Sequence, residues 1–179
     1  PCAPIGQTQL DRLAELGADL PMCLCPRPLR ARGIGERLAF VDLPPLPAVL
    51  VNPRVAVSTP AVFAALARRE NPPMPETLPA FADAAAAIDW LADQRNDMET
   101  AATGLAPRIG TVLDTLAAQP GCALARMSGS GATCFGLFPT ADAAQEATLQ
   151  IARSRPDWWV AGGLLGDQSE RAMPRAYAS

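Results

Sequence analysis

The residues best suited to chemistry lie in a glycine- and serine-rich segment at residues 126–138, which reads RMSGSGATCFGLF. The apolar runs on both sides of the glycines predict a strand, a tight loop and a second strand. Gly129 and Gly131 can take positive φ, and Ser128 and Ser130 offer hydroxyls, so the loop could turn several backbone N–H groups toward one anion. A phosphate-facing loop is one interpretation. An ordinary hairpin turn uses the same residues, and the loop alone does not separate the two.

A carboxylate follows a predicted helix near the start of the chain. Asp19 stands in LGADLP, just before a predicted strand, where it could accept a proton in a cleft or merely cap an exposed loop. The chain has no His and no Lys, because all 15 basic residues are Arg. This excludes Ser-His and Cys-His nucleophiles, a Walker phosphate loop and a Schiff-base Lys. A general base must then be a carboxylate, Tyr177 or a Cys thiolate.

Two further groups of residues are candidates for a binding site. Thr59 and Phe63 are four residues apart on a predicted helix and therefore share a face, although such a Phe is commonly a core residue. Asn96, Asp97 and Glu99 occur together in RNDMET, where they either cap a helix or shape a cleft. The sequence by itself leaves both alternatives open at both places.

The cysteines favour core packing over metal binding or disulfide formation. Their number is odd and their spacing lacks the pairs typical of zinc sites; they are Cys2, Cys23, Cys25, Cys122 and Cys134. No His is available as a co-ligand, and we therefore expect reduced, mostly buried thiols and no metal site.

Composition bounds the function of the chain. Its 179 residues are 49% hydrophobic and 18% charged, enough for one core and part of a second. A net charge of −3 and scattered arginines argue against nucleic acid or an anionic membrane as partner. The apolar windows are short and no basic, apolar leader opens the chain, which suggests a cytoplasmic protein. The chain begins at Pro1 without an initiator Met, so we expect a fragment or a processed product.

The elements that must position these residues follow from periodicity and from glycine and proline punctuation. Helices are predicted over residues 8–16, 59–69, 80–94, 105–119 and 141–153, and strands over residues 20–24, 37–41, 48–51, 122–127, 133–137 and 158–162. The proline-rich residues 43–47 are the expected linker. From residue 48 onward the order fits an α+β fold with helices on one face of an antiparallel sheet.

Three motifs together carry a family resemblance. LGADLP at residues 16–21, VNPRVAVSTPAVF at residues 51–63 and the glycine loop occur in an order that resembles the GHMP family of small-molecule kinases, from about residue 13 to 165. The resemblance implies a ferredoxin-like C-terminal domain at residues 44–168. It also implies that residues 1–43 are the tail of the family's N-terminal domain, of ribosomal-protein-like fold, and that residues 169–179 are a polar tail.

The resemblance also implies roles for the candidate residues. In this family an aspartate at the position of Asp19 accepts the proton of the substrate hydroxyl as its oxygen attacks the γ-phosphoryl group of ATP. Phe63 would stack on the cytosine of a diphosphocytidyl polyol, with Thr59 nearby. ATP is then the co-substrate, and Mg²⁺ would be held largely by ATP.

The glycine loop would have a supporting role under the same resemblance. Ser128, Gly129, Ser130 and Gly131 would buttress the nucleotide-phosphate site, and Asn96 and Asp97 would shape the cleft. The main ATP loop of the family, Pro-x-x-x-Gly-Leu-Gly-Gly-Gly-Ser-Ser, and its active-site Lys do not occur in these 179 residues. We therefore expect an incomplete kinase; the alternatives are another GHMP kinase, acting on homoserine, mevalonate or galactose, and a non-catalytic ferredoxin-like binding module. Oligomeric state is not predicted.

Overall fold

The computed structural model describes residues 26–33, 35 and 37–170. The chain divides into two compact units, one of Pro1–Leu43 with Gly166–Ser179 and one of Pro44–Leu165. The predicted helix over residues 8–16 and the predicted strand over residues 20–24 lie outside the described residues.

The first unit contains a two-stranded antiparallel hairpin. Strand β1 (Leu29–Arg32) pairs with β2 (Arg37–Phe40) along its whole length, and Gly33 and Gly35 take positive φ in the turn between them. Only β2 was predicted from the sequence, because the prolines before β1 read as an interruption. Pro28 instead lies just outside the strand, and its carbonyl accepts a hydrogen bond from the Val41 amide at 3.1 Å.

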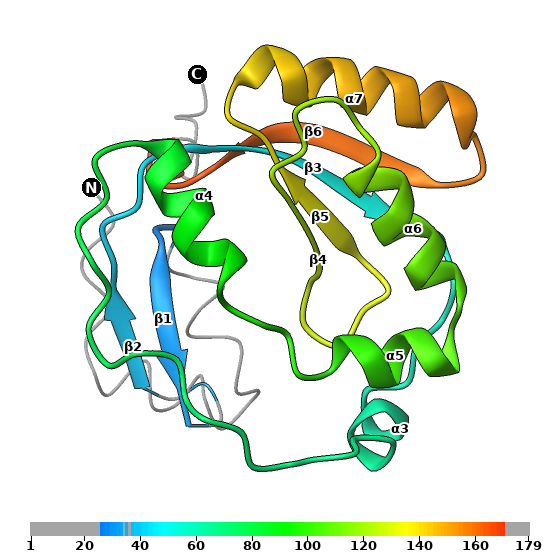
Figure 1. The fold of residues 1–179 in the computed structure, drawn as a ribbon, viewed down its shortest axis with the longest axis horizontal. Helices are drawn as coiled ribbons and strands as arrows, with labels where there is room; N and C mark the ends of the chain where they lie inside the picture. Colours follow the sequence, from blue (N-terminus) through cyan, green and yellow to red (C-terminus); the bar gives the residue numbers. More distant parts are fainter. Residues whose placement is uncertain (1–25, 34, 36, 171–179) are drawn as a thin grey trace, which may run out of the picture. The chain divides into compact units, whose positions relative to one another are not determined.

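The second unit combines strands and helices (Figure 1). Its strands are β3 (Leu46–Asn52), β4 (Leu124–Met127), β5 (Cys134–Leu137) and β6 (Trp159–Leu165). Its helices are α3 (Thr59–Ala64), α4 (Ala84–Ala92), α5 (Glu99–Leu105), α6 (Arg108–Ala117) and α7 (Ala141–Ser154).

The four strands form one antiparallel sheet in the order β4-β5-β3-β6. A first strand followed by helices, a hairpin, a helix and a last strand beside the first is the split β-α-β arrangement of ferredoxin-like domains. The α+β, ferredoxin-like fold predicted from the sequence is therefore confirmed.

The helices that pack closely on the sheet cover one of its faces. Helices α6 and α7 pack on one face over a buried core that includes Val49, Val51 and Cys134 (Figure 1). Successive side chains of a strand point to opposite faces, so Arg126, which neighbours the buried Met127, points away from that core. Its guanidinium donates hydrogen bonds to carbonyls at the C-terminal end of α4, at 2.7 and 3.2 Å. The C-terminal end of α4 thus lies beside the edge strand β4, on the side away from that core.

Three predicted element boundaries are wrong in ways that matter for the site. Helix α3 ends at Ala64 rather than near residue 69, which frees the following residues to line a groove. The helix predicted over residues 105–119 is α6, which begins only at Arg108, after Pro107, and the short helix α5 before it was not predicted. Strand β3 begins at Leu46, inside the expected linker.

Candidate functional site

A groove of about 510 Å³ opens where α3, the turn before α5 and the β4–β5 loop come together. Its lining includes aromatic rings, arginines, a carboxylate and loop backbone; the residues are Phe63, Leu66, Arg68, Arg69, Asn71, Arg95, Asn96, Asp97, Met98, Met127, Ser128, Gly129 and Phe135. This volume is within the range of small-molecule sites. Figure 1 shows α3 and α5 side by side at this end of the unit, where the two helices contact each other.

The glycine loop takes the backbone conformation that its sequence predicts. Gly129 and Gly131 have φ of 56° and 89°, values that L side chains rarely adopt. The Ser128 amide donates to the Thr133 carbonyl at 2.8 Å, and the Gly131 amide donates to the Ser128 carbonyl at 3.0 Å. These two amides are therefore engaged inside the loop, and fewer N–H groups remain to face an anion than the sequence alone suggested.

The Asn96 side chain holds the first residues of the glycine loop in place by hydrogen bonds. Its side-chain amide donates to the Met127 carbonyl at 2.9 Å and to the Gly129 carbonyl at 2.8 Å, while its oxygen accepts from the Met98 amide at 3.0 Å. The carboxylate of Glu99 accepts from the Met127 amide at 2.8 Å. Every polar atom of the Asn96 side chain is thus used to place the start of the loop against the start of α5.

A hydrogen bond between two hydroxyls joins α3 to the glycine loop. The Thr59 and Ser130 oxygens lie 2.7 Å apart, although the residues are 71 positions apart in the chain. Thr59 begins α3, whose N-cap is Ser58, and the next residue is a proline suited to a first helical turn. The helix that carries Phe63 is therefore tied directly to the loop.

Phe63 does not lie in the core. Its side chain is 51% exposed and borders the groove, while Val62 beside it is fully buried. An exposed aromatic ring at the rim of a groove offers a flat apolar surface for a planar ligand. Phe135 lines the same groove from β5.

The Arg95 guanidinium is held by two neighbouring groups of the protein. It donates to the Asp97 carboxylate at 2.5 Å and also to the Pro72 carbonyl. Asp97 therefore pairs with Arg95 rather than with the glycine loop, and the two residues anchor the connection between α3 and α4.

The structure brings most of the predicted site residues to one place. Phe63, Asn96, Asp97, Ser128 and Gly129 border the groove. Hydrogen bonding adds Thr59 and Ser130, whereas Gly131 packs inward, where an added Cβ would lie 2.9 Å from the Met127 sulfur. Asp19 lies outside the described residues.

Phe135, Arg68 and Arg69 are among the groove residues that the sequence did not indicate. Phe135 looked like an ordinary strand residue, and Arg68 and Arg69 fell inside the helix predicted to run to residue 69. The signal that was available is the adjacent pair of arginines close behind an aromatic residue.

The described cysteines are not poised as nucleophiles or bases. Burial raises the pKa of the Cys134 thiol to about 12, and burial also raises that of Cys122. Both stay protonated at neutral pH, as expected of free thiols that pack in a core. Within the described residues, no group of three or more Cys, Asp or Glu side chains is placed to hold a metal ion. No helix in that part of the chain is long and apolar enough to cross a membrane.

The sheet order is that of a ferredoxin-like domain, and similarity to known families defines the class of protein. Residues 77–156 match the family described as "GHMP kinases C terminal". The chain belongs to the GHMP kinase family and corresponds to a C-terminal portion of its members.

Relatives with a more specific name cover most of the chain. The 4-diphosphocytidyl-2-C-methyl-D-erythritol kinase of Roseobacter denitrificans is 56% identical over 165 residues, which are 92% of this chain and 55% of that kinase. The kinase of the same name from Paracoccus denitrificans is 57% identical over 155 residues, 86% of this chain and 56% of the relative. The chain thus spans about half the length of these curated relatives.

Solved structures agree with the fold. A crystal structure of 4-(cytidine 5'-diphospho)-2C-methyl-D-erythritol kinase superimposes with a TM-score of 0.68 at 34% identity, over 88% of this chain and 56% of that one. A homoserine kinase from Cytophaga hutchinsonii matches with a TM-score of 0.59 at 18% identity, over 92% of this chain and 59% of that one. The second likeness concerns the fold alone.

Proposed function

We propose that this chain provides the C-terminal part of a kinase that phosphorylates the 2-hydroxyl group of 4-diphosphocytidyl-2-C-methyl-D-erythritol with ATP, in non-mevalonate isoprenoid precursor synthesis. The observation that carries the proposal is the identity of about 55% to kinases of that name over most of the chain. The exposed Phe63 ring at a groove of small-molecule size supports the same substrate class.

In this proposal Asp19 is the general base. The substrate hydroxyl oxygen forms a bond to the γ-phosphorus of ATP, the bond from that phosphorus to the β–γ bridging oxygen breaks, and ADP leaves. The hydroxyl proton passes to the Asp19 carboxylate. Phe63 stacks on the cytosine, Thr59 holds the glycine loop near it through Ser130, and Asn96 keeps that loop in place.

Besides the cytidine substrate, the proposal includes Mg²⁺, the γ-phosphate of ATP and a location in the cell. Mg²⁺ would accompany ATP, but the described residues offer no cluster for it, and we assign it no ligand here. The 179 residues contain no Lys to neutralise the γ-phosphate. A cytoplasmic location and a small-molecule substrate are part of the proposal.

The direct test is a chimaeric enzyme. This chain replaces the matching C-terminal part of the Roseobacter denitrificans relative, and ATP-dependent phosphorylation is measured with the cytidine substrate and, separately, with homoserine. We expect phosphorylation of the cytidine substrate alone, reduced by Asp19→Asn by about 10² to 10⁴ as expected for loss of a general base. The unaltered relative is the control.

Two outcomes would count against the proposal. A folded chimaera that transfers no phosphoryl group would favour a non-catalytic binding module. Transfer to homoserine in preference to the cytidine substrate would favour another member of the family.

A further inference from the structure

Two arginines beside the groove have no hydrogen-bond or ion-pair partner among the described residues. Arg68 and Arg69 both line the groove, and both are exposed. Neither guanidinium makes a hydrogen bond or ion pair with any other residue that the structure describes. They lie just behind α3, where the chain leaves the helix earlier than its sequence suggests.

The charges around the groove do not cancel. The carboxylate in its lining belongs to Asp97, and this group is paired with Arg95 at 2.5 Å. The positive charges of Arg68 and Arg69 are therefore uncompensated within the lining, in a chain whose net charge is −3. A local cationic patch in a concave surface attracts anions, because the field is strongest where the walls converge.

The chemistry of the lining changes along the groove. Phe63 and Phe135 supply flat apolar surfaces, and the two arginines supply planar donors that match phosphate oxygens in bidentate geometry. A ligand that satisfies both parts has a planar base joined to a phosphate chain.

We propose that Arg68 and Arg69 form a subsite for the diphosphate group of a nucleoside diphosphate whose base lies against Phe63. The inference rests on the proposed function, since that function supplies the cytidine diphosphate, and it adds the residues that distinguish the diphosphate ester from a bare nucleoside. The phosphates of ATP offer the same chemistry, so the test compares the two nucleotides.

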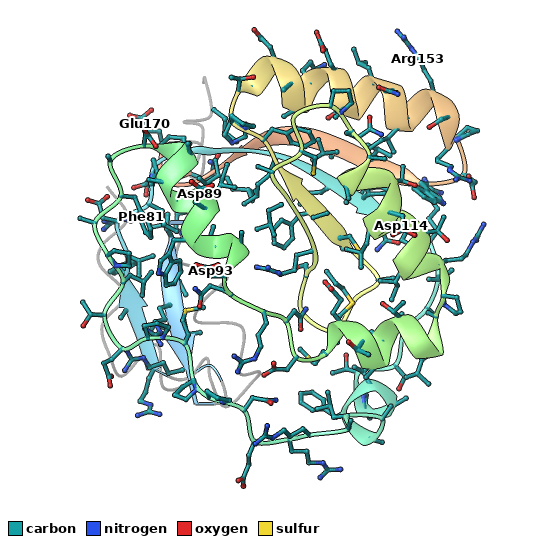
Figure 2. All side chains as sticks on the ribbon, viewed as in Figure 1. Phe81, Asp89, Asp93, Asp114, Arg153 and Glu170 are labelled. Carbon is teal, nitrogen blue, oxygen red and sulfur yellow. The ribbon has the colours of Figure 1, made fainter. Side chains whose placement is uncertain are left out.

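The test measures binding to the full chain by calorimetry, with cytidine, CDP and ADP as probes. The variant is Arg68→Gln with Arg69→Gln, and its conservative counterpart is Arg68→Lys with Arg69→Lys. The matched control is Arg153→Gln, because Arg153 is exposed and, as Figure 2 shows, projects from the end of α7 away from the sheet. Circular dichroism verifies that each variant is folded.

We expect CDP to bind at least about tenfold more tightly than cytidine, since charge-assisted hydrogen bonds to phosphate are stronger than neutral ones. The double Gln variant should lose about tenfold in CDP affinity and nothing in cytidine affinity, with Arg153→Gln unchanged. The double Lys variant should recover part of the loss. CDP binding should also weaken with added salt, a response that a purely structural role would not produce.

Other results overturn the inference. If the double Gln variant binds CDP as tightly as the parent does, the arginines do not form a diphosphate subsite. An equal loss for cytidine that Lys does not rescue makes the arginines structural. A loss confined to ADP assigns them to ATP instead.

The proposed function and this subsite can fail separately. If the chimaera is active and its KM for the cytidine substrate is unchanged by Arg68→Gln with Arg69→Gln, the kinase proposal stands and the subsite is refuted. An inactive chimaera whose chain still binds CDP through the arginines would do the reverse. A chain that binds neither cytidine nor CDP would overturn the subsite and the cytidine site together.

Discussion

Hydroxyl and amide side chains at this site act mainly on one another and on the backbone. Asn96 uses all its hydrogen-bonding atoms to place the glycine loop, and Thr59 and Ser130 join that loop to α3. Amide and hydroxyl groups suit such connections because each can both donate and accept hydrogen bonds, so that few polar atoms stay unpaired. The exposed side chains at the groove include the aromatic ring of Phe63 and the guanidinium groups of Arg68 and Arg69.

The Thr59–Ser130 hydrogen bond leads to a prediction about substrate use. In the chimaeric kinase, Thr59→Val and Ser130→Ala should each lower kcat/KM for the cytidine substrate about threefold to tenfold, the range expected for one neutral hydrogen bond. Thr59→Ser keeps the hydroxyl and should stay close to the parent. Because both single changes break the same bond, the double variant should be no worse than either; additive losses would show that the residues act independently.

The buried Cys134 thiol leads to a prediction about pH. Its pKa is raised to about 12 by burial, from an ordinary value of 9.0. Between these values the unfolded chain releases the proton and the folded chain keeps it, so this contribution to stability is complete below pH 9 and falls as the pH rises toward 12. Urea unfolding at pH 8 and pH 10 should show a smaller loss of stability in Cys134→Ala than in the parent. Equal losses in both proteins would contradict the burial effect.

At the scale of elements, the short strands β4 and β5 act as a frame for the loop between them. The paired strands fix where the loop starts and ends, and Asn96 and Glu99 hold its first residues. The position of α5 explains why the carboxylate of Glu99 reaches the Met127 amide. A loop held at both ends by a sheet needs residues with special backbone freedom inside it.

The two loop glycines should therefore differ in their tolerance of a side chain. Nothing lies within 4 Å of a Cβ added at Gly129, whereas at Gly131 it would lie 2.9 Å from the sulfur of Met127, which is itself buried. Gly129→Ala should cost about 1 to 2 kcal/mol, the strain of a positive φ. Gly131→Ala adds overpacking and should cost about 2 to 5 kcal/mol. Denaturant unfolding of both variants measures the difference, and equal costs would contradict the packing beneath the loop.

The whole molecule comprises two compact units, and the second contains the buried core cluster that a domain needs to fold by itself. The buried cluster around Val49, Ile109 and Phe138 lies entirely within the second unit. That unit also contains all the residues that border the groove. A domain with its own core and its own binding surface is expected to fold as one cooperative body.

Residues 44–165 expressed alone should accordingly unfold in a single cooperative transition. Ile109 is fully buried, and Ile109→Ala should lower the stability of this fragment by about 2 to 5 kcal/mol through loss of packing. Thermal and urea denaturation followed by circular dichroism measure both effects. A broad, non-cooperative melt of the parent fragment would show that its core depends on the rest of the chain.

Much of the fold was predictable because its signals are local. Strand β5 and helix α7 lie close to their predicted bounds, since a short apolar run and helical periodicity define them in the sequence. Strand β1 was missed and the helix after Thr59 was drawn too long. The prolines before β1 hid it although its partner β2 follows after a short turn, and the residues after Ala64 are good helix formers that the structure nevertheless leaves outside α3.

The sequence by itself determined the family, the ferredoxin-like order of elements and the need for positive φ at Gly129 and Gly131. These follow from residue types and spacing, which act locally or are inherited as motifs. Tertiary structure alone decided that Thr59 meets Ser130, that Asn96 holds the loop, and that Arg68 and Arg69 face the groove. Such contacts join segments separated by tens of residues, and only the packing of the sheet and its helices fixes the distances between them.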